Sequence, residues 1–225
     1  MNKINVVIET GKKRIFASAL DWPGWSRSGR DEESALQALL AYGPRYAKVV
    51  QIAELEYQPP SDTTAFVVTE RLQGNATTDF GAPGMIADSE KDPIDQSEFE
   101  RLSALLKGCW GAFDSAAQQA MGKELRKGPR GGGRDLEKIQ EHVMGADQGY
   151  LRSLGWKPEK ADQRNSKEEL RQIREEIVSA LESAIKGELP EQGPRGGKRW
   201  PPRYFVRRVA WHVLDHAWEI EDRIE

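Results

Sequence analysis

Apolar side chains spaced three and four positions apart fill the second half of the chain, and this spacing most constrains its fold. The first stretch contains Phe99, Leu102, Leu106, Cys109, Phe113, Ala116 and Ala120. Three later stretches have the same spacing: Leu136, Ile139, Val143, Ala146 and Tyr150; Leu170, Ile173, Ile177, Leu181 and Ala184; and Phe205, Val209, Val213, His216 and Ile220. At 3.6 residues per turn each stretch presents one apolar face, so together they predict a four-helix bundle over residues 95–225.

Local signals predict where these helices begin. Asp135 is placed to cap the second helix or to lie in its first turn. Ser166 and Glu169 have the spacing of a capping box at the start of the third. Pro201 and Pro202 open the fourth, where the missing N–H groups of proline cost little.

The first 74 residues carry strand signals instead. The runs INVVIE and RIFASAL are separated by the turn residues Gly11 and Lys12 and predict a hairpin. The loop DWPGWSRSGRDEE follows, and its Ser28 or Asp31 can cap the next helix. Two further extended runs, AELEY and AFVVTE, are separated by a proline pair. The predicted order is therefore strand, strand, helix, strand, strand.

Residues 75–94 show no period and are rich in Gly, Pro, Asp and Thr, so we interpret them as a loop between two domains. The prediction is an α+β chain, with a small α+β module at 1–74, an inter-domain loop at 75–94 and a helical bundle at 95–225. The length of 225 residues suits one large domain or two small ones.

Composition narrows the functional classes. The formal net charge of -3 argues against a general nucleic-acid or membrane binder. No apolar run approaches the roughly 18 residues of a membrane span. The opening MNKINVVIET lacks the pattern of a signal peptide, so we expect a cytoplasmic protein. The only cysteine, Cys109, lies in an apolar stripe and is interpreted as an inert core residue.

The chain has three histidines, and all of them fall on predicted helices of the bundle. His212 and His216 are four residues apart, so they share one helix face about 6 Å apart. His142 lies beside Ile139 and Val143 on the inward face of the second helix. An HxxxH pair alone is more often a coincidence of surface or core, but the third inward histidine predicts a divalent metal site.

The segment HVLDH also resembles the inverted zinc-protease motif HxxEH. In that motif the acid is a glutamate that serves as the general base, whereas Asp215 is one carbon shorter. No further helix follows in this sequence to supply another ligand. We therefore reject the protease interpretation.

Two segments resemble a known family. The second helix, EHVMGADQGYLRSLGW, and the fourth, RRVAWHVLDHAWEIEDR, are similar to the DinB-like superfamily of four-helix bundles, over about residues 95–225. The resemblance implies a divalent metal, zinc or nickel, held by His142, His212 and His216 with open positions. It also implies a crossover between the second and third helices, and transfer or isomerisation that uses a low-molecular-weight thiol.

The N-terminal stretch ASALDWPGWSRSGRDEESALQALL is similar to the HicB-like antitoxin fold. That resemblance covers about 45 residues and rests on a strand, a PG-containing loop and an EEA-type helix start. The DNA-binding tail of such antitoxins is not evident in the sequence. We therefore do not infer repression.

Several other side chains are candidates for the site. Asp215 and Glu219 could orient an imidazole or move a proton, although the charged segment EIEDRIE also fits a solvated helix end. Arg130 and Arg195, in the two GPRGG turns, could bind an anionic cofactor or substrate, although such turns are common between helices. The repeat of GPRGG before both histidine-bearing helices could also reflect a faint internal duplication of the sequence. Trp200, Trp211 and Trp218 are interpreted as packing residues.

Two functions remain at this point. The first is a metal-dependent enzyme acting on a small-molecule substrate, with thiol transfer ahead of hydrolysis. The second is a non-catalytic binding protein in which the metal stabilises the bundle and the N-terminal module recognises a protein or nucleic acid. An open metal position would favour the enzyme, and a fourth protein ligand would favour the scaffold. We expect no membrane partner and leave a homodimer open.

Overall fold

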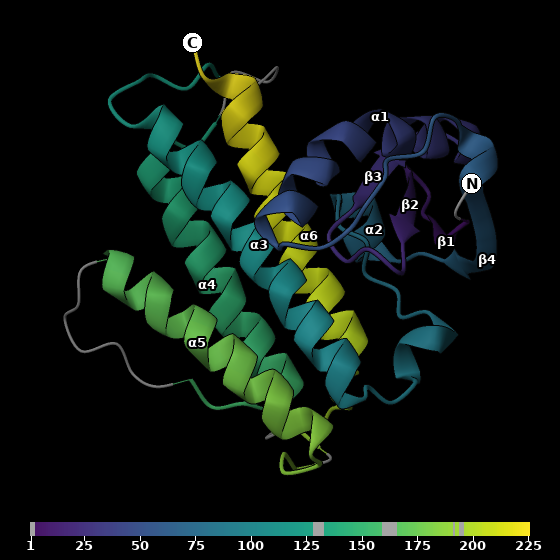
Figure 1. The fold of residues 1–225 in the computed structure, drawn as a ribbon, viewed down its shortest axis with the longest axis vertical. Helices are drawn as coiled ribbons and strands as arrows, with labels where there is room; N and C mark the ends of the chain where they lie inside the picture. The colour runs from purple at the N-terminus through teal and green to yellow at the C-terminus, as the bar shows by residue number, and fades with distance from the viewer. Residues whose placement is uncertain (1–2, 128–132, 159–165, 191, 194–195) are drawn as a thin grey trace.

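The computed structural model describes residues 3–127, 133–158, 166–190, 192–193 and 196–225 (Figure 1). They form an α+β structure. The strands are β1 (Ile4–Thr10), β2 (Ile15–Ala19), β3 (Ser26–Gly29) and β4 (Phe66–Gln73). The helices are α1 (Glu32–Ile52), α2 (Ala76–Phe80), α3 (Gln96–Ala120), α4 (Leu136–Leu154), α5 (Ser166–Ile185) and α6 (Pro202–Arg223). Two short 3-10 helices span Thr63–Ala65 and Asp88–Lys91.

The four strands form one mixed sheet in the order β3-β2-β1-β4. β1 and β2 pair antiparallel, with Ile8 opposite Ala17, which confirms the predicted hairpin. β4 runs parallel to β1 after the chain has crossed over through α1. Asp31 caps α1 by accepting a hydrogen bond of 2.7 Å from the backbone of Ser34.

Two predictions in this module are wrong. Ser26–Gly29, predicted as loop, is the edge strand β3, which pairs antiparallel with β2. Its polar residues carry no apolar alternation, and the pairing with β2 is a contact that local sequence does not encode. The run AELEY, predicted as a strand, instead follows directly on α1. Glu54 there adopts a φ of 56°, which turns the chain out of the helix.

The segment 75–94, predicted as a loop without regular structure, contains α2 and a 3-10 helix. Asn75 caps α2 through a 2.7 Å hydrogen bond from Thr77. Further along, the buried carboxylate of Glu9 accepts hydrogen bonds from the backbones of Gly84 and Met85, at 2.9 and 3.0 Å. These side-chain contacts order the segment without any apolar period.

The four helices predicted for residues 95–225, α3 to α6, begin where they were predicted to begin. Asp95 and Asp135 cap α3 and α4 through hydrogen bonds of 2.8 and 2.9 Å. Pro201 precedes the first residue of α6. α5 begins at Ser166. The Ser166 side chain lies outside the described part of the structure, so its capping box with Glu169 stays a prediction.

Contacts between helix ends give the direction of each helix. Arg203 near the start of α6 pairs with Glu98 near the start of α3, so these two helices run parallel. At the other end of α6, Arg223 donates to the carbonyl of Arg134, just before α4. The backbone of Trp200, just before α6, donates to Ser153 near the end of α4, so α4 and α6 are antiparallel.

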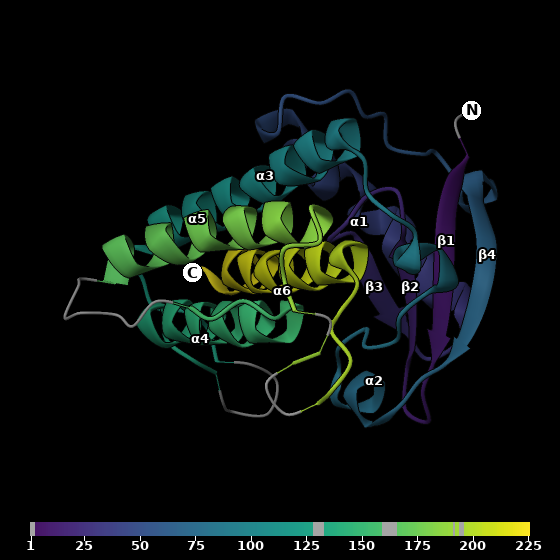
Figure 2. The same cartoon turned by 90° about the horizontal axis from the view of Figure 1, so that it is seen from below.

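α5 runs parallel to α4. Gln148 donates to Glu169, and Trp156, just beyond α4, donates to Glu176, about two turns further along α5. The end of α4 and the start of α5 therefore lie at opposite ends of the pair, which agrees with the predicted crossover between these helices. Viewed from below, α6 lies between α5 and α4, and the sheet lies at the right of the view (Figure 2).

The buried core is continuous from the sheet to the long helices. Ile8 of β1 and Trp25 belong to the same cluster of buried residues as Phe113 of α3 and Phe205 of α6. α1 contacts both the sheet and α3. The proposed domain boundary at 75–94 therefore stays a prediction.

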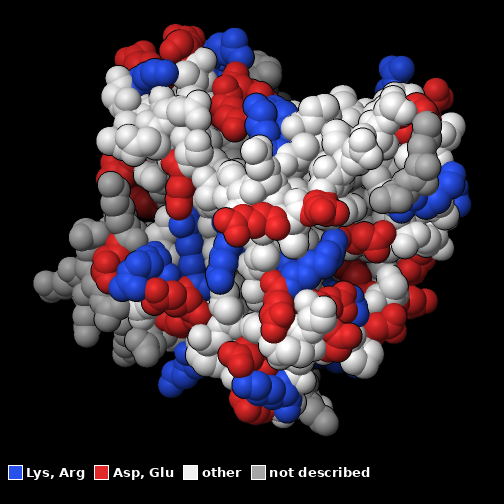
Figure 3. Space-filling model, viewed as in Figure 1, with Lys and Arg blue, Asp and Glu red and all other residues white. Residues whose placement is uncertain are grey.

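The described helices include none that combines the length and apolar character of a membrane span. On the face seen in Figure 3, basic and acidic side chains are interspersed and form no continuous basic area among the described residues. This distribution agrees with the small net charge of -3.

Candidate metal centre

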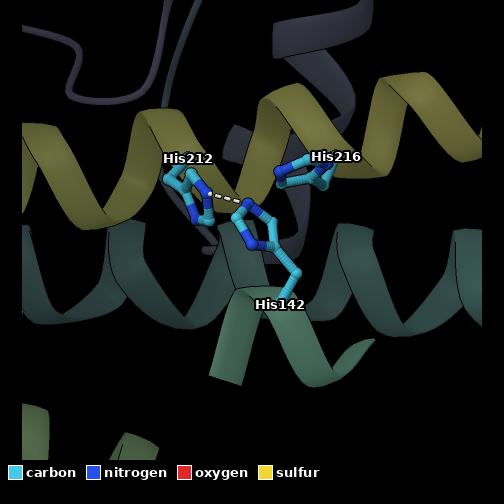
Figure 4. Close-up of side chains that lie close together, drawn as sticks. All are labelled: His142, His212 and His216. Carbon is cyan, nitrogen blue, oxygen red and sulfur yellow. Dashed lines mark hydrogen bonds between the residues drawn. The ribbon is translucent and has the colours of Figure 1, made fainter. Parts of the chain in front are cut away.

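The three histidines lie together between α4 and α6 (Figure 4). His142 projects from α4, and His212 and His216 project from consecutive turns of α6. One ring nitrogen of each lies within 4.8 Å of the others. The Nε2 atoms of His142 and His212 are 3.2 Å apart. The prediction that these side chains form one cluster is thus confirmed by the geometry.

Packing explains why the imidazoles converge. Ile139 and Val143 bury one face of α4 against α6, and His142 lies beside them. α6 is buried along most of its length, so His212 and His216 are only 7% and 8% exposed. Because the two helices are antiparallel and closely packed, one turn of α4 lies opposite two turns of α6.

The imidazoles of His142 and His212 are in the protonation state that binds metal. Burial is the largest cause that lowers the pKa of His212 well below its usual value, followed by the neighbouring His216 and His142. Burial, then the charge of Arg134, also lowers the pKa of His142. Both rings are therefore neutral at pH 7 and keep a lone pair for a cation.

The spacing of the His142–His212 pair also fits a metal ion. A zinc–nitrogen bond of about 2.0–2.1 Å in a tetrahedral site places two ligand nitrogens roughly 3.3 Å apart. The separation of 3.2 Å between His142 Nε2 and His212 Nε2 matches that value. Without a cation, two neutral imidazoles held this close in a buried site can share only one proton between them.

Glu219 holds the imidazole of His216 in place. Its Oε2 atom lies 2.7 Å from Nδ1 of His216, and its Oε1 atom accepts a 2.5 Å hydrogen bond from Arg223. The hydrogen bond with His216 is the largest cause of the lowered pKa of Glu219. A carboxylate on Nδ1 orients the ring so that Nε2 is the ligand atom, an arrangement typical of histidine ligands in metal sites.

Asp215 is not brought into the cluster. Its Oδ1 atom pairs with Arg27 of β3 at 3.1 Å, on the side of α6 that contacts the sheet. Burial raises the pKa of Asp215, and Arg27 opposes that effect. These contacts suit a link between sheet and helix, so the predicted catalytic role of Asp215 gains no support from them.

The predicted anion-binding residues Arg130 and Arg195 lie outside the described residues. Arg208, which the sequence interpretation did not single out, lies next to the histidines instead. It is four residues before His212 and therefore on the same face of α6. That spacing is the signal by which the sequence alone could have found it.

The aromatic candidates pack as predicted. The ring of Trp211 meets Phe16 of β2 edge-on at 6.2 Å, and Trp218 meets Tyr42 of α1 at 4.9 Å. Trp200 lies 5.3 Å from Tyr150 of α4. Cys109 is fully buried, and burial raises the pKa of its thiol.

The second residue missed by the sequence interpretation is Asp147. It occupies the position in the core face of α4 where the apolar spacing suggested Ala146, and it is 0% exposed. Neither carboxyl oxygen has a hydrogen-bond partner among the described residues. Burial raises the pKa of this group to about 8, and Arg174 only partly opposes the shift.

Comparisons of the chain with protein-family models, with curated proteins and with solved structures find no match. The site is therefore interpreted from its own geometry.

Proposed function

We propose that the chain binds one divalent metal ion, zinc or nickel, through His142, His212 and His216, and is a metal-dependent enzyme of the DinB-like kind. The activity we favour is transfer to or from a low-molecular-weight thiol, with hydrolysis as the second possibility. The observation that carries the proposal is the convergence of three imidazoles, with one ring nitrogen of each within 4.8 Å of the others.

The arrangement of the long helices supports the family assignment. α3 and α6 run in one direction, α4 and α5 in the other, and the chain crosses over between α4 and α5. The histidines come from the second and fourth of these helices. Both features are those that the resemblance to the DinB-like bundles implies.

The ligand set supports an enzyme over a metal-stabilised scaffold. Among the described residues, no Cys, Asp, Glu or further His joins the three histidines within the same distance. Structural zinc sites are almost always closed by four protein ligands, whereas catalytic sites use three and leave a position open. Three neutral ligands also leave the charge of a dication uncompensated, which favours an anionic fourth ligand.

A bound divalent metal would favour deprotonation of a thiol or water molecule at the open position. The contribution of this chain is to hold the imidazoles in place. Glu219 fixes the ring of His216, and Arg223 in turn fixes Glu219. Tyr150 packs edge-on against His212 at 5.7 Å and covers that ring on the side of α4.

Elemental analysis of untagged protein tests the metal site. We expect one zinc or nickel per chain in the wild type, and loss of most of the metal in His142→Ala, His212→Ala and His216→Ala. Glu219→Gln should keep the metal but lower its affinity about 10–100-fold in a chelator competition, because it removes only the support of one ligand. Full occupancy in all three histidine variants would disprove the site.

Glu221→Gln is the matched control for Glu219→Gln. Glu221 lies two residues further along α6 and pairs with Arg45 of α1, away from the histidines. The Glu221→Gln variant should leave the metal affinity unchanged. An equal loss of affinity in both variants would show a general effect of charge, and the orienting role of Glu219 would then be wrong.

A further inference from the structure

Arg208 is a buried arginine with too few partners. It is 6% exposed. Its Nη1 atom donates to the carbonyl of Pro83 at 3.2 Å, and its Nη2 atom donates to the hydroxyl of Tyr150 at 3.3 Å. Its Nε atom is buried and has no partner among the described residues. Both hydrogen bonds are longer than the roughly 2.7–2.9 Å of a charge-assisted bond to a carboxylate.

The charge of Arg208 is also uncompensated. Among the described residues, no carboxylate lies within ion-pair distance of its guanidinium group. The adjacent Arg207 makes the contrast plain, because its equally buried guanidinium pairs with Glu90 at 2.5 Å. A buried arginine is normally paired, since removal of an unpaired charge from water is costly.

Two aromatic rings compensate only part of that cost. The guanidinium carbon of Arg208 lies 5.4 Å from the ring of Tyr150 and 5.0 Å from the ring of Trp211. Cation–π contacts at such distances are weaker than an ion pair. The two rings pack against the guanidinium group, but they do not supply the negative charge that would balance it.

Arg208 lies beside the histidines, on the same face of α6 as His212. Arg208 precedes His212 by one turn, a rise of about 6 Å along the helix. Tyr150 connects the two, because its hydroxyl accepts the hydrogen bond from Arg208 while its ring packs against His212. The charge of Arg208 is among the causes of the low pKa of His212, which agrees with this proximity.

We propose that Arg208 binds the carboxylate group of the ligand whose other end reaches the open metal position. This inference rests on the proposed function and narrows the ligand to a small carboxylic acid, because Arg208 and His212 are only one helical turn apart on α6. A monoanion matches the site because one guanidinium carries one charge and the neighbouring Arg207 is neutralised by Glu90.

Cobalt-substituted protein gives a direct test. The probes are 3-mercaptopropionate and its neutral amide, whose thiolates produce a charge-transfer absorption when they bind cobalt. We expect wild-type protein to bind the acid at least tenfold more tightly than the amide, and Arg208→Met to lose that preference while it binds the amide as before. An equal preference in both proteins, or an equal loss for both probes, would overturn the inference.

The control variants separate charge from packing. Arg45→Met removes another arginine that lies over two rings, those of Tyr42 and Trp218, but that pairs with Glu221 and Asp222. It should keep the preference for the acid. Arg208→Met should also be at least as heat-stable as wild type, because an apolar side chain replaces a buried unpaired charge. A marked loss of stability would instead make Arg208 a structural residue.

A second measurement keeps the inference separate from the metal proposal. In metal-free protein, we expect NMR titration to show tighter binding of propionate than of propionamide, and Arg208→Gln to abolish the difference. If cobalt does not bind, the proposed function fails, and this titration alone decides the role of Arg208. Equal binding of propionate and propionamide to wild type would then overturn it.

Discussion

Asp147 makes the stability of the protein depend on pH. Its pKa in the folded state is about 8, whereas an aspartate in an unfolded chain has a pKa of about 3.9. A carboxyl group whose pKa is raised by folding stabilises the fold while it is protonated. Its contribution is therefore complete below about pH 4 and is lost as the pH rises toward 8.

We expect Asp147→Asn to remove this dependence. Each unit of pKa difference corresponds to about 1.4 kcal/mol, so wild type should lose several kcal/mol of unfolding free energy between pH 5 and pH 8, relative to the variant. Urea unfolding at several pH values measures this difference. The exposed Asp92→Asn is the control and should follow wild type. Parallel stability curves for wild type and Asp147→Asn would contradict the expectation.

Which site residues the sequence could reveal depends on their partners. The histidines were predictable because their spacing and inward faces are local properties of two helices. Glu219 was predictable as an orienting residue because it lies within one turn of His216. The roles of Arg208 and Asp147 depend on which charges are missing around them after folding, and no local pattern encodes the absence of a partner.

At the scale of elements, the helices were more predictable than the sheet. α3, α4 and α6 start at caps and prolines that the sequence displays, and the apolar period of each of the four bundle helices is a property of its own segment. β3 was missed because an edge strand of four polar and small residues exists only through its pairing with β2. α2 was missed because Asn75 and Glu9, rather than an apolar period, hold its segment in place.

Gly24 determines how closely the N-terminal loop packs on α6. It has a φ of 94°, and a Cβ added there would lie 2.9 Å from Leu214 and 3.1 Å from Ala210. We expect Gly24→Ala to lower the unfolding free energy by roughly 1–3 kcal/mol, because it combines backbone strain with a clash against the helix. Urea denaturation measures the loss.

Gly122→Ala is the matched control. Gly122 also has a positive φ, 73°, but a Cβ added there meets no atom within 4 Å. The Gly122→Ala variant therefore measures the effect of backbone strain alone. The additional loss of unfolding free energy in Gly24→Ala measures the effect of packing against α6. Equal losses in the two variants would mean that the loop and helix do not constrain each other.

At the scale of the whole molecule, the continuous core predicts joint unfolding. Residues of β1, α3 and α6 share one buried cluster, so exposure of the sheet also exposes the long helices. We expect a single cooperative transition, with far-UV circular dichroism and tryptophan fluorescence changing at the same denaturant concentration. Two separated transitions would show that 1–74 and 95–225 fold independently.

The two helices that carry the histidines differ in how much change they can absorb. α6 is buried along most of its length between the sheet and the other helices, so a new side chain at most of its positions disturbs neighbours (Figure 2). α4 is more open. Gly145 and Gly149 follow His142 by three and seven positions on the same face, and a Cβ at either position meets nothing within 4 Å. Efforts to alter the selectivity of the proposed site by directed evolution should therefore diversify these two glycines and leave α6 intact.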